Sequence, residues 1–282
     1  FLMSLTLGLD AIMQWLTRSM SLVESKMVAA ERVIEYSNLE PEENIKDLDP
    51  NYFKEKTKNW PRKGQIEFVN YTSSYRDNLP IILEHLNLKI DGEQKIGIIG
   101  RTGVGKSSLF QAFFRMMFVH SGQILIDDVD IHKIPIEKAR SLFSIVPQEP
   151  HLFSGSLRFN LDRTGQYSTE EMWNALKEVS LEESIAKLPK GIDAELTERG
   201  ANFSVGQRQL ICMARAILTQ AKIILMDEAT ASVDLETDSM IYKTIDRSFK
   251  NKTVLIIAHR LDTLKNCDKI IVLGKNGHID YG

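Results

Sequence analysis

The stretch "KIGIIGRTGVGKSSLF", residues 95–110, decides the fold. An apolar run leads into a turn of the form G-x-x-x-x-G-K-S, from Gly100 to Ser107, and a helical pattern follows. In this order of strand, turn and helix, glycines let backbone N–H groups converge on phosphate oxygens, while lysine adds a positive charge and serine offers a hydroxyl to Mg²⁺. We therefore predict that this loop binds a nucleotide. The residues expected to contact it are Gly100, Arg101, Thr102, Gly103, Val104, Gly105, Lys106, Ser107 and Ser108.

A second run, "KIILMDE" at residues 222–228, supplies the acidic groups that phosphate chemistry needs. Apolar residues lead into Asp227, which is placed to hold Mg²⁺, and Glu228, which is placed to polarise an attacking water. This pattern is common by itself, but together with the phosphate loop it predicts a hydrolytic site. A guanine-specific site is disfavoured, because no N-K-x-D occurs and "NKTV" at residues 251–254 opens a strand.

Short β-rich runs alternate with helical ones along residues 65–282, and several of these runs are apolar throughout. Such runs are typical of strands covered on both faces, so the alternation predicts an α/β domain with a largely parallel core sheet. Residues from about 150 to 220 carry helical patterns and little strand signal, which predicts a helical lobe inserted between core strands. The expected strands are residues 65–69, 82–90, 95–100, 123–127, 142–146, 222–227, 253–259 and 269–273, and the expected helices are residues 105–117, 168–179, 206–218 and 238–249.

The first 64 residues differ in character from the rest of the chain. Residues 1–37 are helical in pattern, whereas residues 38–64 are charged and broken by three prolines, as in a linker. The opening run "FLMSLTLGLDAIMQWL" is too short for a full membrane span, and Asp10 interrupts it. From these residues alone it is either the end of a transmembrane helix or an amphipathic helix packed on the domain.

Composition excludes several classes of protein. The chain has 282 residues and a formal net charge of −3, so it lacks the basic surface that a nucleic-acid partner requires. Its two cysteines, Cys212 and Cys267, are too few for a disulfide framework and lack metal-ligand spacing. We expect both to be small apolar residues in a reduced, cytosolic setting.

The order of motifs over residues 65–282 resembles the nucleotide-binding domain of ATP-binding-cassette (ABC) proteins. The phosphate loop is followed by "VPQEP", "FSVGQRQ", "LMDEATASVD" and "AHR", as in that family. The resemblance implies ATP and Mg²⁺ as ligands, and it implies an antiparallel β part beside the core sheet. It also implies that Tyr75 stacks on adenine, that Gln148 reaches Mg²⁺ and the water, and that His259 contacts the γ-phosphate. Asp234 resembles the loop residue that touches the opposite subunit.

A finer resemblance is to the second nucleotide-binding domain of the C subfamily, the multidrug-resistance-associated exporters. It rests on "ERVIEY", "WPRKGQIEFVN", "FSGSLRFNLD" and "NFSVGQRQL", and on Glu228, where first domains usually carry Asp. The resemblance implies that residues 1–37 are the end of the last transmembrane helix. It implies partners within the same transporter, namely a first nucleotide-binding domain and the membrane domains. The implied location is the cytosolic side of a membrane, for which we expect the plasma membrane.

The segment Ser204-Val205-Gly206-Gln207 has two compatible roles. Ser204 and Gln207 form an S-x-x-Q capping box at a helix start, and a helix N-terminus is also an anion site. In the family this site closes on nucleotide held by another domain, so two domains join head to tail. Glycine usually stands where this chain has Val205, which implies a weaker half-site.

Two alternatives come from other functional classes. Some C-subfamily members regulate a channel, and nothing in the sequence separates that role from export. A soluble ABC ATPase acting on DNA is disfavoured, because the stretch from Lys106 to Ser204 is too short for a long coiled-coil insertion and holds no cysteine pair.

Overall fold

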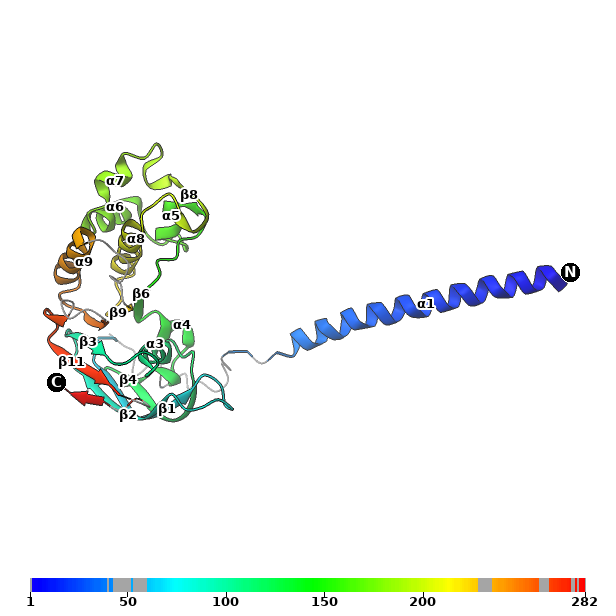
Figure 1. The fold of residues 1–282 in the computed structure, drawn as a ribbon, viewed down its shortest axis with the longest axis horizontal. Coiled ribbons are helices and arrows are strands. Elements are labelled where there is room, and N and C mark those ends of the chain that lie inside the picture. Colours follow the sequence, from blue (N-terminus) through cyan, green and yellow to red (C-terminus); the bar gives the residue numbers. More distant parts are fainter. Residues whose placement is uncertain are drawn as a thin grey trace. The chain divides into compact units, whose positions relative to one another are not determined.

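A computed structural model describes residues 2–39, 41–42, 52, 60–227, 235–258, 264–274, 277 and 279–281. The chain divides into two compact units, Phe1–Ile45 and Lys46–Gly282. The first unit consists of one helix, α1, from Leu2 to Ser37 (Figure 1). No proline interrupts α1, and Asn38 and Pro41 follow its end.

Apolar side chains are exposed along the described part of α1, including Trp15, Met20 and Val33. Among the residues that the structure describes, no helix is both long and apolar enough to span a bilayer.

The centre of the second unit is a six-stranded sheet with the order β12-β11-β3-β10-β9-β6 (Figure 1). Five neighbouring strands are parallel and β12 pairs antiparallel with β11, which confirms the predicted core sheet. Parallel strands bury both faces, and the residues between the ends of β3, β9 and β10 are accordingly apolar and buried. The strands are β3 (Lys95–Ile99), β6 (Phe143–Val146), β9 (Ile223–Asp227), β10 (Thr253–Ile257), β11 (Lys269–Leu273) and β12 (Ile279–Tyr281).

A four-stranded antiparallel sheet with the order β2-β1-β4-β5 covers one side of the core, as the family resemblance implied. Its strands are β1 (Ile66–Ser74), β2 (Leu83–Ile90), β4 (Phe118–Ile126) and β5 (Val129–Asp130). Helix α3 (Lys106–Phe113) packs Leu109, Phe110 and Phe113 into the apolar cluster that joins the two sheets. The short helices η2 (Ile131–Lys133) and α4 (Ile136–Arg140) follow β5.

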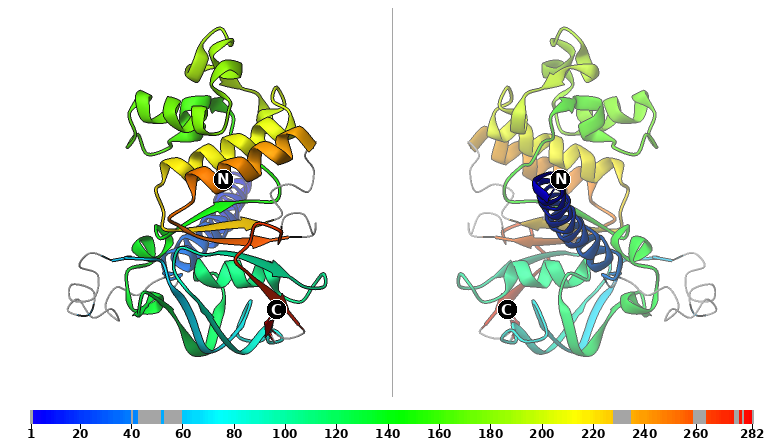
Figure 2. Two further views of the ribbon diagram at one scale, coloured as in Figure 1. Left: turned by 90° about the vertical axis from the view of Figure 1, so that its left-hand side faces the viewer. Right: turned by 90° about the vertical axis from the view of Figure 1, so that its right-hand side faces the viewer.

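The predicted helical lobe is present at one end of the second unit (Figures 1 and 2). Helix α8 runs beside α9 (Leu235–Ser248), and both pack against the face of β6, β9 and β10 opposite to α3. The lobe contains α5 (Leu157–Leu161), α6 (Thr169–Glu178), α7 (Glu182–Ala186), α8 (Val205–Leu218), the short strands β7 (Gly155–Ser156) and β8 (Glu195–Leu196), and the turns η3 (Gly191–Asp193) and η4 (Glu198–Gly200).

The end of the region expected to be a linker is attached to the antiparallel sheet. The Asp127 carboxylate accepts backbone hydrogen bonds from each residue of 62–65, at 2.6–3.0 Å. The indole Nε1 of Trp60 donates to the Ile126 carbonyl at 2.6 Å. Residue 60 and residues 62–65 are therefore attached to the hairpin of β4 and β5.

Candidate nucleotide-binding site

The phosphate loop connects the end of β3 to the start of α3. Gly105, the residue before α3, has φ 101°, a left-handed conformation that residues with a Cβ rarely adopt. A Cβ on Gly100 would lie 2.5 Å from the Leu273 carbonyl oxygen, so only glycine fits there. A cavity of about 770 Å³ adjoins the loop and is lined by residues 81–82, 99–104 and 272–274. Its volume is in the range of small-molecule sites.

Lys106 is folded back over its own loop. Its side chain is 8% exposed, and its Nζ donates to the carbonyl oxygens of Gly100 at 2.7 Å and Arg101 at 3.2 Å. These two bonds hold the ammonium group at the mouth of the loop. A positive charge in that position attracts the phosphates of a nucleotide.

Tyr75 lies just beyond the end of β1. Its ring is 45% exposed, and its Oη lies 2.8 Å from the hydroxyl of Ser108, in the first turn of α3. The structure therefore places the hydroxyl of this tyrosine beside the first turn of α3, directly after the phosphate loop.

The predicted magnesium residues Ser107 and Asp227 meet at the carboxyl ends of β3 and β9. The Ser107 hydroxyl donates to the Asp227 carboxylate at 3.4 Å. Gln148 follows the end of β6 at the same edge of the sheet, and its side chain is exposed. Hydroxyl, carboxylate and amide oxygens are the ligands that Mg²⁺ prefers, so these residues fit that ion. Glu228, Asp234 and His259 lie outside the described residues.

The capping box predicted at the start of α8 is present. The Ser204 hydroxyl accepts from the Gln207 N–H at 3.1 Å, and the Gln207 Oε1 accepts from the Ser204 N–H at 3.0 Å. Val205 is 36% exposed and Gly206 is buried. Both hydrogen bonds are formed within the segment from Ser204 to Gln207. Helix α8 belongs to the helical lobe, whereas the phosphate loop belongs to the core (Figure 1). The two segments that we predict to bind anions are thus on different parts of the domain.

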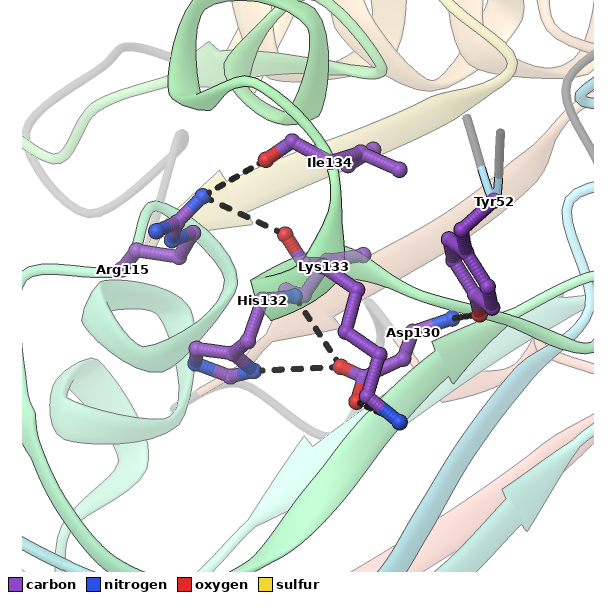
Figure 3. A network of polar contacts seen from close by, with 7 residues as sticks. Tyr52, Arg115, Asp130, His132, Lys133 and Ile134 are labelled. Carbon is purple, nitrogen blue, oxygen red and sulfur yellow. Dashed lines mark hydrogen bonds and ion pairs between the residues drawn. The ribbon is translucent and has the colours of Figure 1, made fainter. Parts of the chain in front are cut away.

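A polar network supports the far end of α3 (Figure 3). Arg115 donates to the Ile134 carbonyl at 2.9 Å and the Ile131 carbonyl at 3.4 Å. Next to it, the Asp130 carboxylate accepts from the His132 N–H at 3.0 Å and lies 3.8 Å from the Lys133 ammonium. Burial favours the neutral form of Asp130, but its hydrogen bonds with His132 and the charge of Lys133 outweigh it and lower the Asp130 pKa.

This network was not predicted from the sequence. Its members are single polar residues at the ends of short elements. One of them, Tyr52, comes from the region expected to be a linker. The Tyr52 Oη accepts a hydrogen bond from the Asp130 N–H at 3.1 Å. Such contacts leave no periodic pattern of apolar and polar residues in the sequence. The nearest sequence signal is the Asp-x-His pattern of Asp130 and His132, an aspartate that caps the N–H two residues on.

Comparison with known proteins identifies the family. The profile of the family described as "ABC transporter" matches residues 83–231. ATP-binding cassette sub-family C member 2 of Mus musculus is 44% identical over 283 residues, which cover 100% of this chain and 18% of the relative. Human sub-family C member 4 is 47% identical over 279 residues, which cover 99% of this chain and 21% of the relative. Bile pigment transporter 1 of Saccharomyces cerevisiae is 43% identical over 289 residues, which cover 96% of this chain and 18% of the relative.

The chain spans about a fifth of the length of these curated relatives. Its phosphate loop, its α/β core and its helical lobe all lie within the aligned region. The chain therefore belongs to the ABC transporter family, as an ATP-binding domain of the C-subfamily type.

Proposed function

We propose that this chain is the second, ATP-hydrolysing domain of a C-subfamily exporter. The observation that carries the proposal is the meeting of Lys106, Ser107 and Asp227 at the carboxyl edge of one parallel sheet. Phosphoryl transfer needs positioning and charge compensation more than covalent chemistry, and these are the groups that supply both.

In the proposed reaction, Tyr75 stacks on adenine and the loop of residues 100–108 holds the phosphates. Ser107, Asp227 and Gln148 hold Mg²⁺, which when bound offsets the negative charge of the β- and γ-phosphates. Glu228 is the general base that polarises the attacking water. His259 contacts the γ-phosphate and stabilises the charge that develops on it.

Catalysis is proposed to require a second domain. Ser204, Val205, Gly206 and Gln207 cover a nucleotide bound to the partner, with the N-terminus of α8 directed at its phosphates. Asp234 contacts the partner across the dimer. The exposed side chain of Val205 stands where the backbone would approach phosphate, so the half-site on this chain is the weaker one. The presence of Glu228 assigns the competent site to this chain's own phosphate loop.

The proposed organisation places residues 1–37 at the end of the last transmembrane helix, residues 38–64 in a linker and residues 65–282 in the nucleotide-binding domain. The partners are then the first nucleotide-binding domain and the membrane domains of the same transporter. The domain lies on the cytosolic side, for which we propose the plasma membrane. Closure on ATP drives the change of access, and hydrolysis resets it.

The proposed cargo is an organic anion or drug. The name of the yeast relative, Bile pigment transporter 1, supports this class. The alternative is a regulatory module of a channel. Stimulation of ATP turnover by an added organic anion supports export, whereas turnover that no such anion changes supports the channel alternative.

The assignment of the general base is tested with Glu228→Gln in the complete transporter. Turnover should fall by roughly 10²–10⁴, the usual effect of losing a general base, while ATP binding persists. Glu170→Gln, the same change on the exposed side of α6, is the control and should retain wild-type turnover. Turnover of Glu228→Gln close to that of the control would refute the assignment.

A further inference from the structure

Tyr75 belongs to the loop that joins β1 to β2, and backbone hydrogen bonds close this loop. The Ile82 N–H donates to the Ser73 carbonyl at 3.0 Å, and the Leu79 N–H donates to the Arg76 carbonyl at 3.1 Å. Ile82, at the far end of the loop, lines the cavity beside the phosphate loop. The conformation of this loop therefore sets both the place of the Tyr75 ring and one wall of the cavity.

The side chain of Ser74 spans the position of Tyr75. Ser74 is 0% exposed, and its Oγ lies 2.5 Å from the Arg76 carbonyl oxygen and 2.9 Å from Nε2 of His120. A carbonyl oxygen only accepts, so the one hydroxyl hydrogen of Ser74 is donated to Arg76. The Ser74 oxygen is then the acceptor for His120, and the His120 Nε2 carries a hydrogen.

His120 reaches Ser74 from the neighbouring strand. In β4, Phe118 pairs with Ser74, and His120 follows two residues later. The rings of Phe118 and His120 lie edge to face, with their centroids 5.1 Å apart and an interplanar angle of 66°, and this contact orients the imidazole. His120 is exposed and lies outside the apolar clusters of the domain, so its bond to Ser74 can be removed without opening the core.

We infer that His120 is a positioning residue for Tyr75: through Ser74 and Arg76 it fixes the loop in the conformation that presents the tyrosine ring to a nucleobase. The inference rests on the proposed role of Tyr75 at adenine. The tip of the ring is held separately, since the Tyr75 Oη lies 2.8 Å from the Ser108 hydroxyl. A ring that is already fixed loses less conformational freedom when the base binds, so the base is bound more tightly.

The phosphates are bound by a different part of the structure. The phosphate loop lies between β3 and α3, and Lys106 is held by carbonyl oxygens of that loop itself. Loss of the His120 bond should therefore weaken the contact with the base and spare the contacts with phosphate.

The first test separates the base from the phosphates by titration calorimetry of the 282-residue chain with ATP and with inorganic tripolyphosphate, each with Mg²⁺. His120→Ala should weaken ATP binding by roughly three- to tenfold, the usual effect of losing one hydrogen bond, and leave tripolyphosphate binding within about twofold. His120→Gln, whose amide N–H replaces the lost donor, should bind ATP within about twofold of wild type. Unchanged ATP affinity in His120→Ala, an equal loss for both probes, or an equal ATP loss in both variants would overturn the inference.

The second test asks whether His120 acts through Tyr75. In a Tyr75→Ala background, His120→Ala should cause no further loss of ATP affinity, since both substitutions remove the same contact with the base. A further loss as large as that in the wild-type background would overturn the inference.

The third test needs no nucleotide. In His120→Ala, amide hydrogen exchange of Leu79 and Ile82 should accelerate by roughly three- to tenfold, because the loop loses one of the bonds that fix it, while exchange in α6 stays at the wild-type rate. His151→Ala, a change of another exposed histidine, is the control and should leave both amides unchanged.

Unchanged exchange of the two loop amides, or the same acceleration in α6, would overturn the inference. A wild-type chain that binds neither ATP nor tripolyphosphate would instead refute the proposed function, and the exchange experiment would still decide the inference.

Discussion

Replacing Ser204 with aspartate separates the structural role of this residue from its proposed role at a nucleotide. Ser204 caps α8, with its hydroxyl 3.1 Å from the Gln207 nitrogen. Aspartate, asparagine and serine cap helices about equally well. We therefore expect Ser204→Asp and Ser204→Asn to change the free energy of unfolding by less than about 0.5 kcal/mol.

The aspartate, however, adds a negative charge to an exposed helix start that we propose faces phosphate. Two like charges at about 4 Å repel by about 4 kcal/mol at an effective dielectric constant of about 20. Each 1.4 kcal/mol corresponds to a factor of about ten, so the unscreened loss of affinity is several hundredfold. Salt and solvent reduce this figure, and we expect at least a tenfold loss at physiological ionic strength.

The assay compares Ser204→Asp with Ser204→Asn in the complete transporter. Nucleotide retained at the site covered by Ser204 is measured together with ATP turnover, and thermal unfolding of the chain controls for the cap. Loss of nucleotide in the aspartate variant alone supports the half-site. Equal nucleotide retention and turnover in the two variants, with unchanged unfolding, would show that Ser204 only caps the helix.

Two further predictions concern stability. Burial, followed by the charge of Lys222, lowers the pKa of Lys252 to about 8, so the folded state is penalised as pH falls through that value. Lys252→Met should raise the free energy of unfolding at pH 7 by about 1 kcal/mol after allowance for solvent screening, and by less at pH 10. Urea unfolding measures both values, and an equal increase at the two pH values would contradict this prediction. The pKa of Asp130 is lower in the folded state than in the unfolded state. The ionised Asp130 carboxylate therefore stabilises the fold above about pH 4, and this stabilisation is lost as pH falls through the folded-state pKa. Asp130→Asn should therefore be less stable than wild type at pH 6, and this deficit should shrink as pH falls below about 4. A deficit that stays the same as pH falls would exclude this role.

Local signals made much of the fold predictable. The apolar runs that form β3, β9 and β10 are buried on both faces. Helices α6 and α8 are long enough for their three- and four-residue periodicity to be recognised in the sequence. The capping box of Ser204 and Gln207 was also predicted, since its members are three residues apart. Strands β7 and β8 were not predicted, because each is only two residues long and too short to show an alternating pattern.

The candidate site was predictable only in part. The phosphate loop is contiguous, so its glycines and Lys106 could be identified as a unit. The bond from Gln209 to Pro147 joins residues 62 positions apart, and that from Arg215 to Asn160 joins residues 55 positions apart. A single sequence contains no local pattern that pairs such residues. The attachment of residues 62–65 to Asp127 was missed for the same reason.

Equilibrium binding of ATP to the 282-residue chain, wild type and Lys106→Ala, tests the central claim most directly. Lys106 contributes one charge-assisted contact to phosphate, worth roughly 1.5–3 kcal/mol, so the variant should bind ATP about 10- to 150-fold more weakly. Far-ultraviolet circular dichroism of the variant, unchanged from wild type, controls for folding. Saturable binding that the substitution weakens in this way is the predicted result. Absence of ATP binding, or equal affinity in the two proteins, would contradict the account.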